Sequence, residues 1–333
     1  MKFDTAVVRS ALLAWHRRHG LAAPWRDSGD PYQVLVAAVM AQQTQMSRVV
    51  PKYDEFMTVF PTVGALAEAS TAAVLRAWAP LGYNMRALRL HKAARRIANE
   101  GWPKSACELE QIDGVGPCTA AIVASFSFGE AVAAIDVNVV RILARLWGDV
   151  GGAMGERDVR PLAERLVSKR TPGRWNQALM DLGALVCTAR APKCNVCPMA
   201  RWCGARVMFD LTPSRFPFAS LEGRPKGKGN RQQLTRVSEE RTSYKTRGQF
   251  AGSRRYYRGR IVQALRELAP GESMTTRRLL GRMQVAGRAP QRQAKACPTE
   301  RADGLDAVGL RALLASLQRD GLVRVERGRV RLP

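Results

Sequence analysis

Four cysteines near the middle of the chain, Cys187, Cys194, Cys197 and Cys203, have the spacing C-x6-C-x2-C-x5-C. Thiolates held this closely can converge on one metal centre. Disulfides are one alternative, but the spacing is tight and asymmetric, and the N-terminus lacks the apolar core of a signal peptide. A four-cysteine zinc site is a second alternative, although zinc modules usually pair two short knuckles and this run contains one. The spacing therefore favours a [4Fe–4S] cluster.

Length and charge narrow the class of protein. The chain has 333 residues, more than one typical domain, and 46% of them are hydrophobic, which is enough for a core. No apolar run approaches the roughly 20 residues that span a bilayer, so we expect no membrane segment. The net charge of +25 makes nucleic acid the simplest partner. The alternative is a basic protein without such a partner, and the excess of Arg over Lys is compatible with it.

The basic residues are unevenly distributed along the chain. Residues 206–333 hold 28 basic and 11 acidic side chains, whereas residues 1–205 hold 25 and 17. From 212 to 255 the sequence is rich in Pro, Gly, Ser, Lys and Arg and has few periodic apolar residues, which is typical of a linker. We therefore predict a first domain over 1–205, a basic flexible linker over 206–255 and a C-terminal module over 256–333.

Helical periodicity dominates the first domain. The expected helices there are Ala6–His19, Tyr32–Met40, Ser47–Val59, Thr71–Trp78, Met85–Glu100, Pro117–Phe126, Val137–Trp147, Val159–Val167 and Trp175–Leu185. The C-terminal module is expected to hold helices at Tyr256–Leu268, Thr276–Met283 and Leu305–Asp320, then a hairpin that turns at Arg327-Gly328. The predicted fold class is an all-α first domain with a small α+β, winged-helix-like module.

The stretch LEQIDGVGPCTAAIVASF places Gly114-Val115-Gly116 between two short helical patterns. The two glycines let a backbone pass close to a partner, and Pro117 opens a helix whose first amides face outward. Such amides bind phosphate without reading sequence, so the stretch is typical of a helix-hairpin-helix. An ordinary helix–helix turn is the alternative. About 20 residues later Asp136 stands where a helix N-cap belongs, and capping alone is its simplest interpretation.

The order of hairpin, aspartate and four-cysteine loop resembles the helix-hairpin-helix DNA glycosylases of base excision repair that carry an iron–sulfur loop. Within them the MutY-type adenine glycosylases are most similar. The matching stretches are PWR at 24–26, PYQVLVAAVMAQQTQMSRVVPKYDEFMTVFPTV at 31–63, LGYNMRALRLHKAA at 81–94, GVGPCTAAI at 114–122 and IDVNVVRILAR at 135–145. The resemblance implies a two-lobed domain that binds double-stranded DNA with a damaged or mismatched base, and a [4Fe–4S] cofactor on the four cysteines.

The resemblance also implies roles for individual residues. The DNA contacts would come from Gln42, Gln43, Thr44, Gln45, Tyr83, Gly114, Val115, Gly116 and Thr119. Gln43 or a neighbour would wedge into the stack left by a flipped base, although a polar helix terminus is the alternative interpretation of these glutamines. Tyr83 would lie near the base opposite. Asp136 would stabilise the positively charged sugar that forms as the glycosidic bond breaks.

Several positions depart from the family pattern. Ala38 occupies the position of the glutamate that protonates the departing adenine, and no Asp or Glu stands elsewhere on that helical stretch. Cys118 occupies the position of the lysine that related enzymes use to cut the strand, so we expect no lyase activity. Asn84 replaces the usual second tyrosine after Tyr83. We see no Nudix-like domain of the kind that senses 8-oxoguanine.

Three functions fit these observations. We expect a monofunctional DNA glycosylase in which Asp136 is the only catalytic carboxylate and whose substrates are bases that leave easily. One alternative is an adenine glycosylase in which another group or water donates the proton. A second alternative is a binder of DNA lesions or structures without catalysis. The protein is expected to be a monomer in the bacterial cytoplasm, at the nucleoid.

Overall fold

The computed structural model describes residues 4–147, 154–206, 252–287 and 305–333, and these form two compact units. The first unit contains the described residues up to 67 and those from 92 to 206. The second contains residues 68–91 together with the described residues from 252 onward, so it is discontinuous in sequence. Most of the linker predicted over 206–255 lies outside the described residues, and the domain boundaries at 205 and 255 stay predictions.

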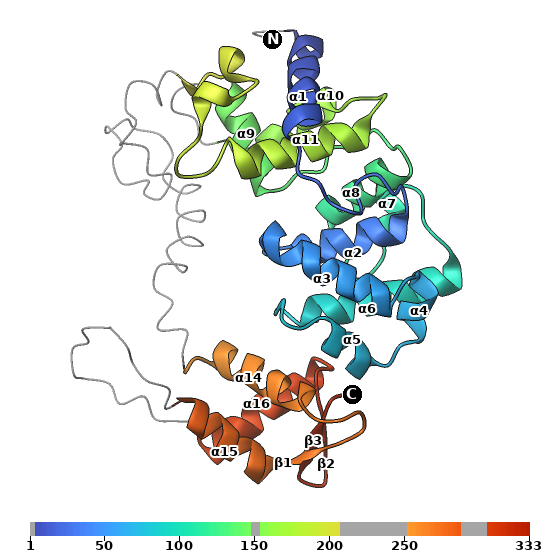
Figure 1. Ribbon diagram of the computed structural model, residues 1–333, viewed down its shortest axis with the longest axis vertical. Helices are drawn as coiled ribbons and strands as arrows, with labels where there is room; N and C mark the ends of the chain where they lie inside the picture. Colours follow the sequence, from blue (N-terminus) through green and yellow to red (C-terminus); the bar gives the residue numbers. More distant parts are fainter. Residues whose placement is uncertain (1–3, 148–153, 207–251, 288–304) are drawn as a thin grey trace, which may run out of the picture. The chain divides into compact units, whose positions relative to one another are not determined.

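The first unit is built of helices that follow the predicted ranges closely (Figure 1). They are α1 (Thr5–His19), α2 (Pro31–Ala41), α3 (Met46–Val59), α4 (Val63–Glu68), the larger part of α6 (Met85–Glu100), α7 (Ala106–Leu109), α8 (Pro117–Ser127), α9 (Val137–Trp147), α10 (Glu156–Leu166) and α11 (Pro172–Leu185). Two 3-10 turns, η1 (Cys194–Val196) and η2 (Ala200–Trp202), follow. Helix α4 was not among the predicted helices, because its six residues are too few to show a clear period.

Polar caps determine where the helices of the first unit begin. The Asp4 carboxylate accepts a hydrogen bond from the Ala6 amide at 2.8 Å, and Asp30 accepts one from Tyr32 at the same distance. Pro31 occupies the first position of α2, where a missing N–H costs nothing. These caps satisfy amides at the starts of α1 and α2 that have no partner within the helix.

One core joins α1, α9, α10 and α11. Its largest fully buried members include Trp175 of α11, Leu12 of α1 and Ile142 and Leu143 of α9. Helix α2 is apolar on nearly all sides and lies between α3 and α8 (Figure 1). Because α2, α8 and α9 are all held by buried side chains, the polar residues at their ends are carried on a rigid frame.

A buried ion pair ties the loop before α2 to α11. Asp181 is 1% exposed, and both of its carboxylate oxygens accept hydrogen bonds from Arg26 at 2.6 Å. The Leu21 amide donates to the same carboxylate at 2.9 Å, and His16 Nε2 lies 3.2 Å away. Burial alone would raise the pKa of Asp181, but the bonds from Arg26 and His16 outweigh it and hold the pKa below the usual range.

We expect Asp181→Asn to lower the free energy of unfolding by roughly 3–5 kcal/mol at neutral pH, because it leaves a buried guanidinium without its charge partner. The depressed pKa means that this stabilisation is present above the unfolded-state pKa of about 4 and is lost as the pH falls through the lower folded value. Urea titrations at several pH values measure both effects. Asp27→Asn, at an exposed position in the same loop, is the control. Equal stability of the two variants would contradict this account.

The second unit combines α5 (Thr71–Ala77) and the start of α6 with a C-terminal module. The module contains α14 (Arg254–Arg266), β1 (Met274–Thr275), α15 (Thr276–Gly287), α16 (Ala307–Arg319), β2 (Arg324–Glu326) and β3 (Arg329–Arg331). The strands form an antiparallel sheet in the order β1-β3-β2. Arg327 and Gly328 have φ values of 46° and 72°, as a tight hairpin turn requires.

The predicted fold class is confirmed: a helical first part, then three helices and a hairpin. Several details of the C-terminal module differ from the expectation. A third strand, β1, was missed because it is only two residues long. Helix α14 begins at Arg254, two residues before the expected helix, and α15 ends at Gly287, four residues beyond the expected Met283. Among the residues that the structure describes, no helix has both the length and the apolar character needed to cross a membrane.

Candidate active site and cysteine loop

A hairpin between α7 and α8 exposes two glycines, Gly114 and Gly116. A capping box formed by Ser105 and Glu108 starts α7. Gly114 has a φ of 93°, a left-handed conformation that favours glycine, and Gly116 is the exposed N-cap of α8. Gly116 has no side chain with which to cap α8. The first turn of α8 is therefore open to an anion such as a phosphate.

Two residues that were predicted to contact DNA at the hairpin have buried side chains. Val115 is 6% exposed and Thr119 is 5% exposed. The Thr119 hydroxyl accepts a hydrogen bond from Gln42 Nε2 at 3.2 Å, which links the start of α8 to the end of α2. Val115 therefore packs in the core and Gln42 engages the Thr119 hydroxyl, and the DNA contacts expected of these two residues stay predictions.

The segment between α2 and α3 carries the four polar residues Gln42, Gln43, Thr44 and Gln45. Gln43 is exposed and has a φ of 55°, in the left-handed region. A residue with a side chain adopts this conformation at a cost of about 1–2 kcal/mol, and such strain often marks a functional position. The backbone therefore sets Gln43 apart from its neighbours, while Gln42 turns inward to Thr119.

Asp136 caps α9 and is half-buried. Its Oδ1 accepts hydrogen bonds from the amides of Asn138 and Val139 at 2.9 and 2.8 Å. Its Oδ2 accepts one from the Asn138 side-chain amide at 2.8 Å. The capping role that the sequence predicts is thus confirmed, and the three bonds hold the carboxylate in one orientation.

A chain of hydrogen bonds connects Asp136 to the cysteine loop. Arg141 donates to Asn138 Oδ1 at 2.8 Å, to the Gly183 carbonyl at 2.9 Å and to the Cys187 carbonyl at 2.8 Å. A Cβ atom on Gly183 would lie 2.6 Å from Asn138 Cβ, so only glycine permits this approach of α11 to α9. The orientation of Asp136 therefore depends on the loop that begins at Cys187.

The sequence predicts base release from DNA, and we expect Arg141→Met to lower its rate by about tenfold or more, since each lost hydrogen bond to a charged group is worth roughly 1.5–3 kcal/mol. Asn138 would lose its anchor, and the carbonyls of Gly183 and Cys187 would lose their donor. Single-turnover assays measure the rate, and metal analysis shows whether the cysteine loop loosens too. Arg160→Met, which removes an exposed ion pair on α10, is the control. A normal rate in Arg141→Met would show that Asp136 is held without the relay.

The four predicted cysteine ligands are brought together. Cys187, Cys194, Cys197 and Cys203 line one cavity of about 30 Å³. The side chain of Arg145, a residue only 5% exposed, donates to Cys187 Sγ at 3.3 Å and to the carbonyls of Thr188 and Ala189 at 2.8 and 3.0 Å. This arginine was not predicted, because nothing in its spacing along the sequence marks it as a support of the loop.

Burial and mutual proximity affect the thiols. Burial, with a smaller contribution from the other three cysteines, raises the pKa of Cys197 to about 11. Burial likewise raises the pKa of Cys203. A cationic centre among the thiols would offset this cost, so the donor set suits an iron–sulfur cluster. In the described ranges, no group of three or more His, Cys, Asp and Glu side chains is arranged so that it could hold a metal ion.

Ala38 and Cys118 lie on α2 and α8, two helices of the first unit that pack extensively against each other. Ala38 is half-buried near the middle of α2. Burial raises the pKa of Cys118 to about 12, and the charges of Asp136 and Glu156 add to this effect. Cys118 is therefore a protonated thiol at neutral pH, unsuited to act as a nucleophile.

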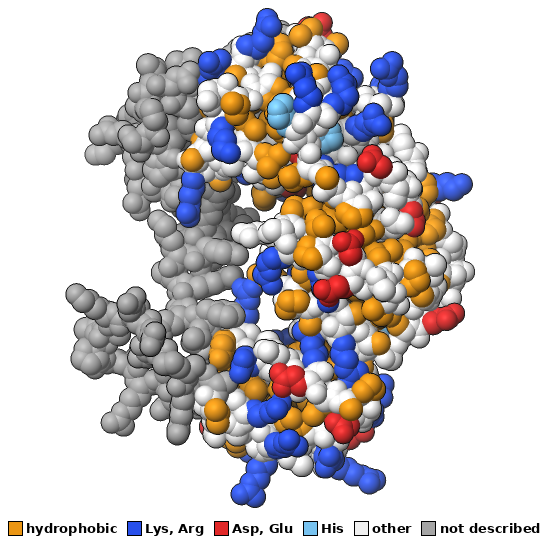
Figure 2. All heavy atoms as spheres, in the orientation of Figure 1, with side chains coloured by type: hydrophobic (Ala, Val, Ile, Leu, Met, Phe, Trp, Pro, Cys, Tyr) orange, Lys and Arg blue, Asp and Glu red, His pale blue; other side chains and the backbone are white. Residues whose placement is uncertain are grey.

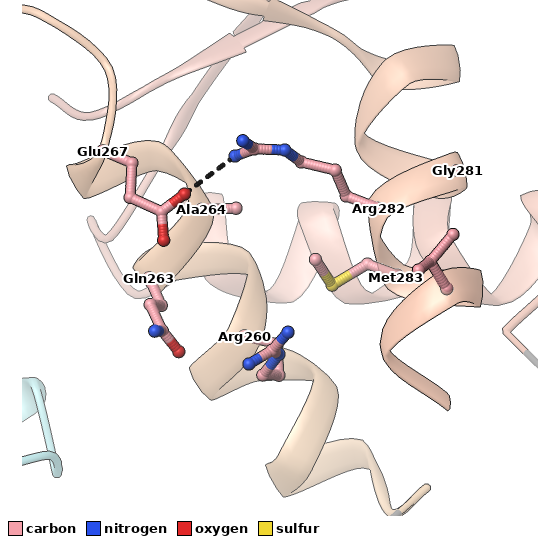
Figure 3. Close-up of a pocket in the computed structure, with 8 residues that line it drawn as sticks. Arg260, Gln263, Ala264, Glu267, Gly281, Arg282 and Met283 are labelled. Carbon is pink, nitrogen blue, oxygen red and sulfur yellow. Dashed lines mark hydrogen bonds and ion pairs between the residues drawn. The ribbon is translucent and has the colours of Figure 1, made fainter. Parts of the chain in front are cut away.

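A cleft between α14 and α15 of the second unit lies elsewhere (Figure 3). It has a volume of about 470 Å³, and the ion pair of Arg282 with Glu267 at 3.0 Å stands at it. None of the predicted site residues lines this cleft. This cleft is not a candidate pocket for a flipped base, because neither Asp136 nor the hairpin contributes to it.

Comparison with known proteins matches this arrangement to one family. The model of the HhH-GPD superfamily of base excision DNA repair proteins matches residues 36–169. An adenine DNA glycosylase of Mycolicibacterium smegmatis is 36% identical over 247 residues, which are 72% of this chain and 83% of that protein. An adenine DNA glycosylase of Mycobacterium tuberculosis is 42% identical over 202 residues, 59% of this chain. The chain therefore belongs to the HhH-GPD superfamily, and its homologues include MutY-type adenine DNA glycosylases.

The match covers only part of some relatives: 66% of the M. tuberculosis protein and 43% of the human adenine DNA glycosylase, which is 37% identical. Among solved structures, a thermostable thymine-DNA glycosylase is 27% identical, with a TM-score of 0.56 over 61% of this chain and 97% of that one. An endonuclease III–DNA complex has a TM-score of 0.52 at 20% identity, with 63% of this chain and 99% of that one covered, and supports the fold alone.

Proposed function

We propose that the protein is a monofunctional DNA glycosylase of base excision repair. The carboxylate of Asp136, fixed by Asn138 and Val139 at the start of α9, carries this proposal. The open first turn of α8 supports DNA binding, because its amides can hold a phosphate of the backbone. The relatives named as adenine and thymine-DNA glycosylases agree with the reaction class.

The chemistry follows from the target. A base inside a duplex must be turned out of the stack before its glycosidic bond can be reached. Gln43, exposed and held in a left-handed conformation, would occupy the space that the base leaves. Hydrolysis then passes through a positively charged sugar, which a carboxylate at Asp136 stabilises more strongly than the neutral ground state. The same carboxylate would orient the attacking water.

The substrate is a base that leaves without protonation by the enzyme. Ala38 cannot donate a proton, and adenine leaves poorly unless it is protonated. Alkylated, deaminated or otherwise activated bases fit this site better. No lysine stands at position 118, and the thiol there is protonated, so release of the base is not followed by strand cleavage.

Adenine is the second candidate substrate, because the relatives at 36–42% identity are named adenine DNA glycosylases. In that case another acid, or water, would protonate the base. The two candidates differ in pH dependence: adenine release through an added proton should accelerate in acid, whereas release of an activated base should depend less on pH.

A panel of duplexes, each with one modified or mismatched base, tests the function. After incubation with purified protein, hot alkali cleaves the DNA at any abasic site, and untreated samples report lyase activity. We expect cleavage of at least one duplex after alkali and none before. Tight binding without base release from any duplex would favour a DNA binder that kept the fold. Gel filtration would test the expected monomer.

We also propose that the four cysteines hold a [4Fe–4S] cluster, which would fix the loop from Cys187 to Cys203. The shared cavity and the buried thiols support this assignment. We expect anaerobically purified protein to be brown and to contain iron, and Cys197→Ser to lose most of it. Cys107→Ser, at an exposed cysteine, is the matched control. Stoichiometric zinc without iron in the wild type would overturn the assignment.

A further inference from the structure

Tyr83 is an exposed aromatic residue in an unusual conformation. Its φ is 47°, in the left-handed region, and it is 45% exposed. Gly82, which precedes it, has a φ of 73°, and its carbonyl accepts a hydrogen bond from the buried Trp78 at 2.9 Å. The hydrogen bond from Trp78 therefore holds the backbone next to Tyr83, and the Tyr83 ring is partly exposed to solvent.

Two arginines flank this ring. The guanidinium of Arg86 lies 5.4 Å from the Tyr83 centroid and 5.4 Å from that of Trp78. The guanidinium of Arg255, from the first turn of α14, lies 4.6 Å from the Tyr83 centroid. Arg86 is 8% exposed, whereas Arg255 is open to solvent. Tyr83 thus connects an internal cation with an external one.

The C-terminal module is docked on the segment that carries Tyr83. The side chain of Arg266, at the end of α14, donates to Asn84 Oδ1 at 2.7 Å, and burial lowers the pKa of Arg266 to about 10. Arg76 donates to the Leu268 carbonyl at 3.1 Å. Asn84 occupies the position at which the family pattern has a second tyrosine. The residue that departs from the pattern is therefore the one that Arg266 of the C-terminal module contacts. Arg255 is therefore held at Tyr83 by a built interface.

Arginines outnumber carboxylates among the described residues of the C-terminal module. Residues 252–287 and 305–333 hold 14 arginines and five carboxylates, and basic side chains are frequent over these elements (Figure 2). Arg254 and Arg255 are exposed and form no ion pair among the described residues. Both occupy the first turn of α14, where the positive end of the helix dipole disfavours cations. An anionic partner would offset that cost.

We infer that Arg255, stacked on Tyr83 and flanked by Arg254, binds a phosphate of the DNA backbone. A guanidinium held against an aromatic ring is fixed in orientation but keeps its donors at the edge, and a phosphate accepts two of them side by side. Tyr83 lies in the stretch that the family model matches, residues 36–169, and Arg255 lies outside it. The C-terminal module would thereby add a DNA contact outside the matched stretch. This inference rests on the proposed function.

Binding of a fluorescent duplex by the full-length protein, at several salt concentrations, tests the inference. Loss of one phosphate contact should reduce the slope of log K against log salt by about 0.9 and weaken binding roughly fivefold at about 0.15 M salt. We expect both changes for Arg255→Gln. Arg255→Lys should keep the slope and lose affinity. Arg324→Gln, an equal change of charge at an exposed position on β2, should alter neither quantity.

The stack makes a second prediction. In a Tyr83→Ala background, Arg255→Gln should have a smaller effect, whereas in a Tyr83→Phe background, which keeps the ring, its effect should be as large as in the wild type. Unchanged slope and affinity in Arg255→Gln, in a variant with the melting temperature of the wild type, would overturn the inference. If Arg255→Gln has a lower melting temperature than the wild type, the affinity of Arg255→Lys becomes the test. Wild-type affinity in Arg255→Lys would then exclude a guanidinium that binds phosphate through two donors. A protein that shows these effects but releases no base would refute the glycosylase proposal alone.

Discussion

Asp136→Asn is expected to reduce base release by at least roughly 10²–10³-fold while leaving duplex affinity within a few-fold of the wild type. The amide that replaces the carboxylate can still accept the hydrogen bonds from the Asn138 and Val139 amides, so the start of α9 should survive. The lost charge matters only when the sugar becomes positive, so the effect falls on the rate and not on binding. Single-turnover assays with saturating enzyme, on the best substrate of the panel, measure it.

Asp158→Asn is the matched control for this variant. Asp158 lies in the first turn of α10 and accepts a hydrogen bond from the Gly155 amide at 2.8 Å, so it also stabilises a helix start but lies on the surface. The Asp158→Asn variant should release the base at the wild-type rate. If Asp136→Asn retained wild-type turnover, Asp136 would be a cap alone, and another carboxylate would have to stabilise the sugar.

Ala38→Glu is expected to raise the rate of adenine release, by up to the roughly 10²–10⁴-fold that general acid catalysis contributes. The wild type should release adenine opposite 8-oxoguanine slowly or not at all, because α2 offers a methyl group where a proton donor is needed. The new carboxyl must remain protonated near neutral pH, and partial burial at position 38 would raise its pKa in that direction. Single-turnover rates on that duplex measure the gain.

Ala38→Gln is the control that separates the effect of an acidic group from the effect of a larger side chain. Glutamine has nearly the same shape as glutamic acid but has no proton of comparable acidity. It should leave adenine release as slow as in the wild type. A wild-type rate on adenine that Ala38→Glu does not exceed would show that another group donates the proton, and adenine would then become the first candidate substrate.

Much of the fold could be predicted from local sequence. The long helices were found within a few residues because their apolar positions repeat with the helical period and their caps are short-range signals. Helix α4 and strand β1 were missed because six and two residues are too short to show a period. The four cysteines could be grouped because their spacing along the chain already forces them close together.

The supports of the site could not be predicted, because they depend on residues far apart in sequence. Asp136 was found as a cap, but Arg141 joins it to the Cys187 carbonyl, 46 positions further along. Arg26 was noted only as part of a motif, and its partner Asp181 lies 155 positions away. Asn84 was noted as a departure from the family pattern, but no local pattern could reveal that a half-buried arginine of α14 binds its side chain.

The discontinuous second unit has a consequence for synthesis of the chain. Asn84 and Arg266 are 182 positions apart, so at about 5–20 residues per second the ribosome needs roughly 10–40 s between them. During that interval, the segment from 68 to 91 has left the ribosome without the module that it receives in the finished protein. Nascent chains arrested near residue 206 should therefore show protease-sensitive sites around Tyr83 that disappear once α14 has emerged.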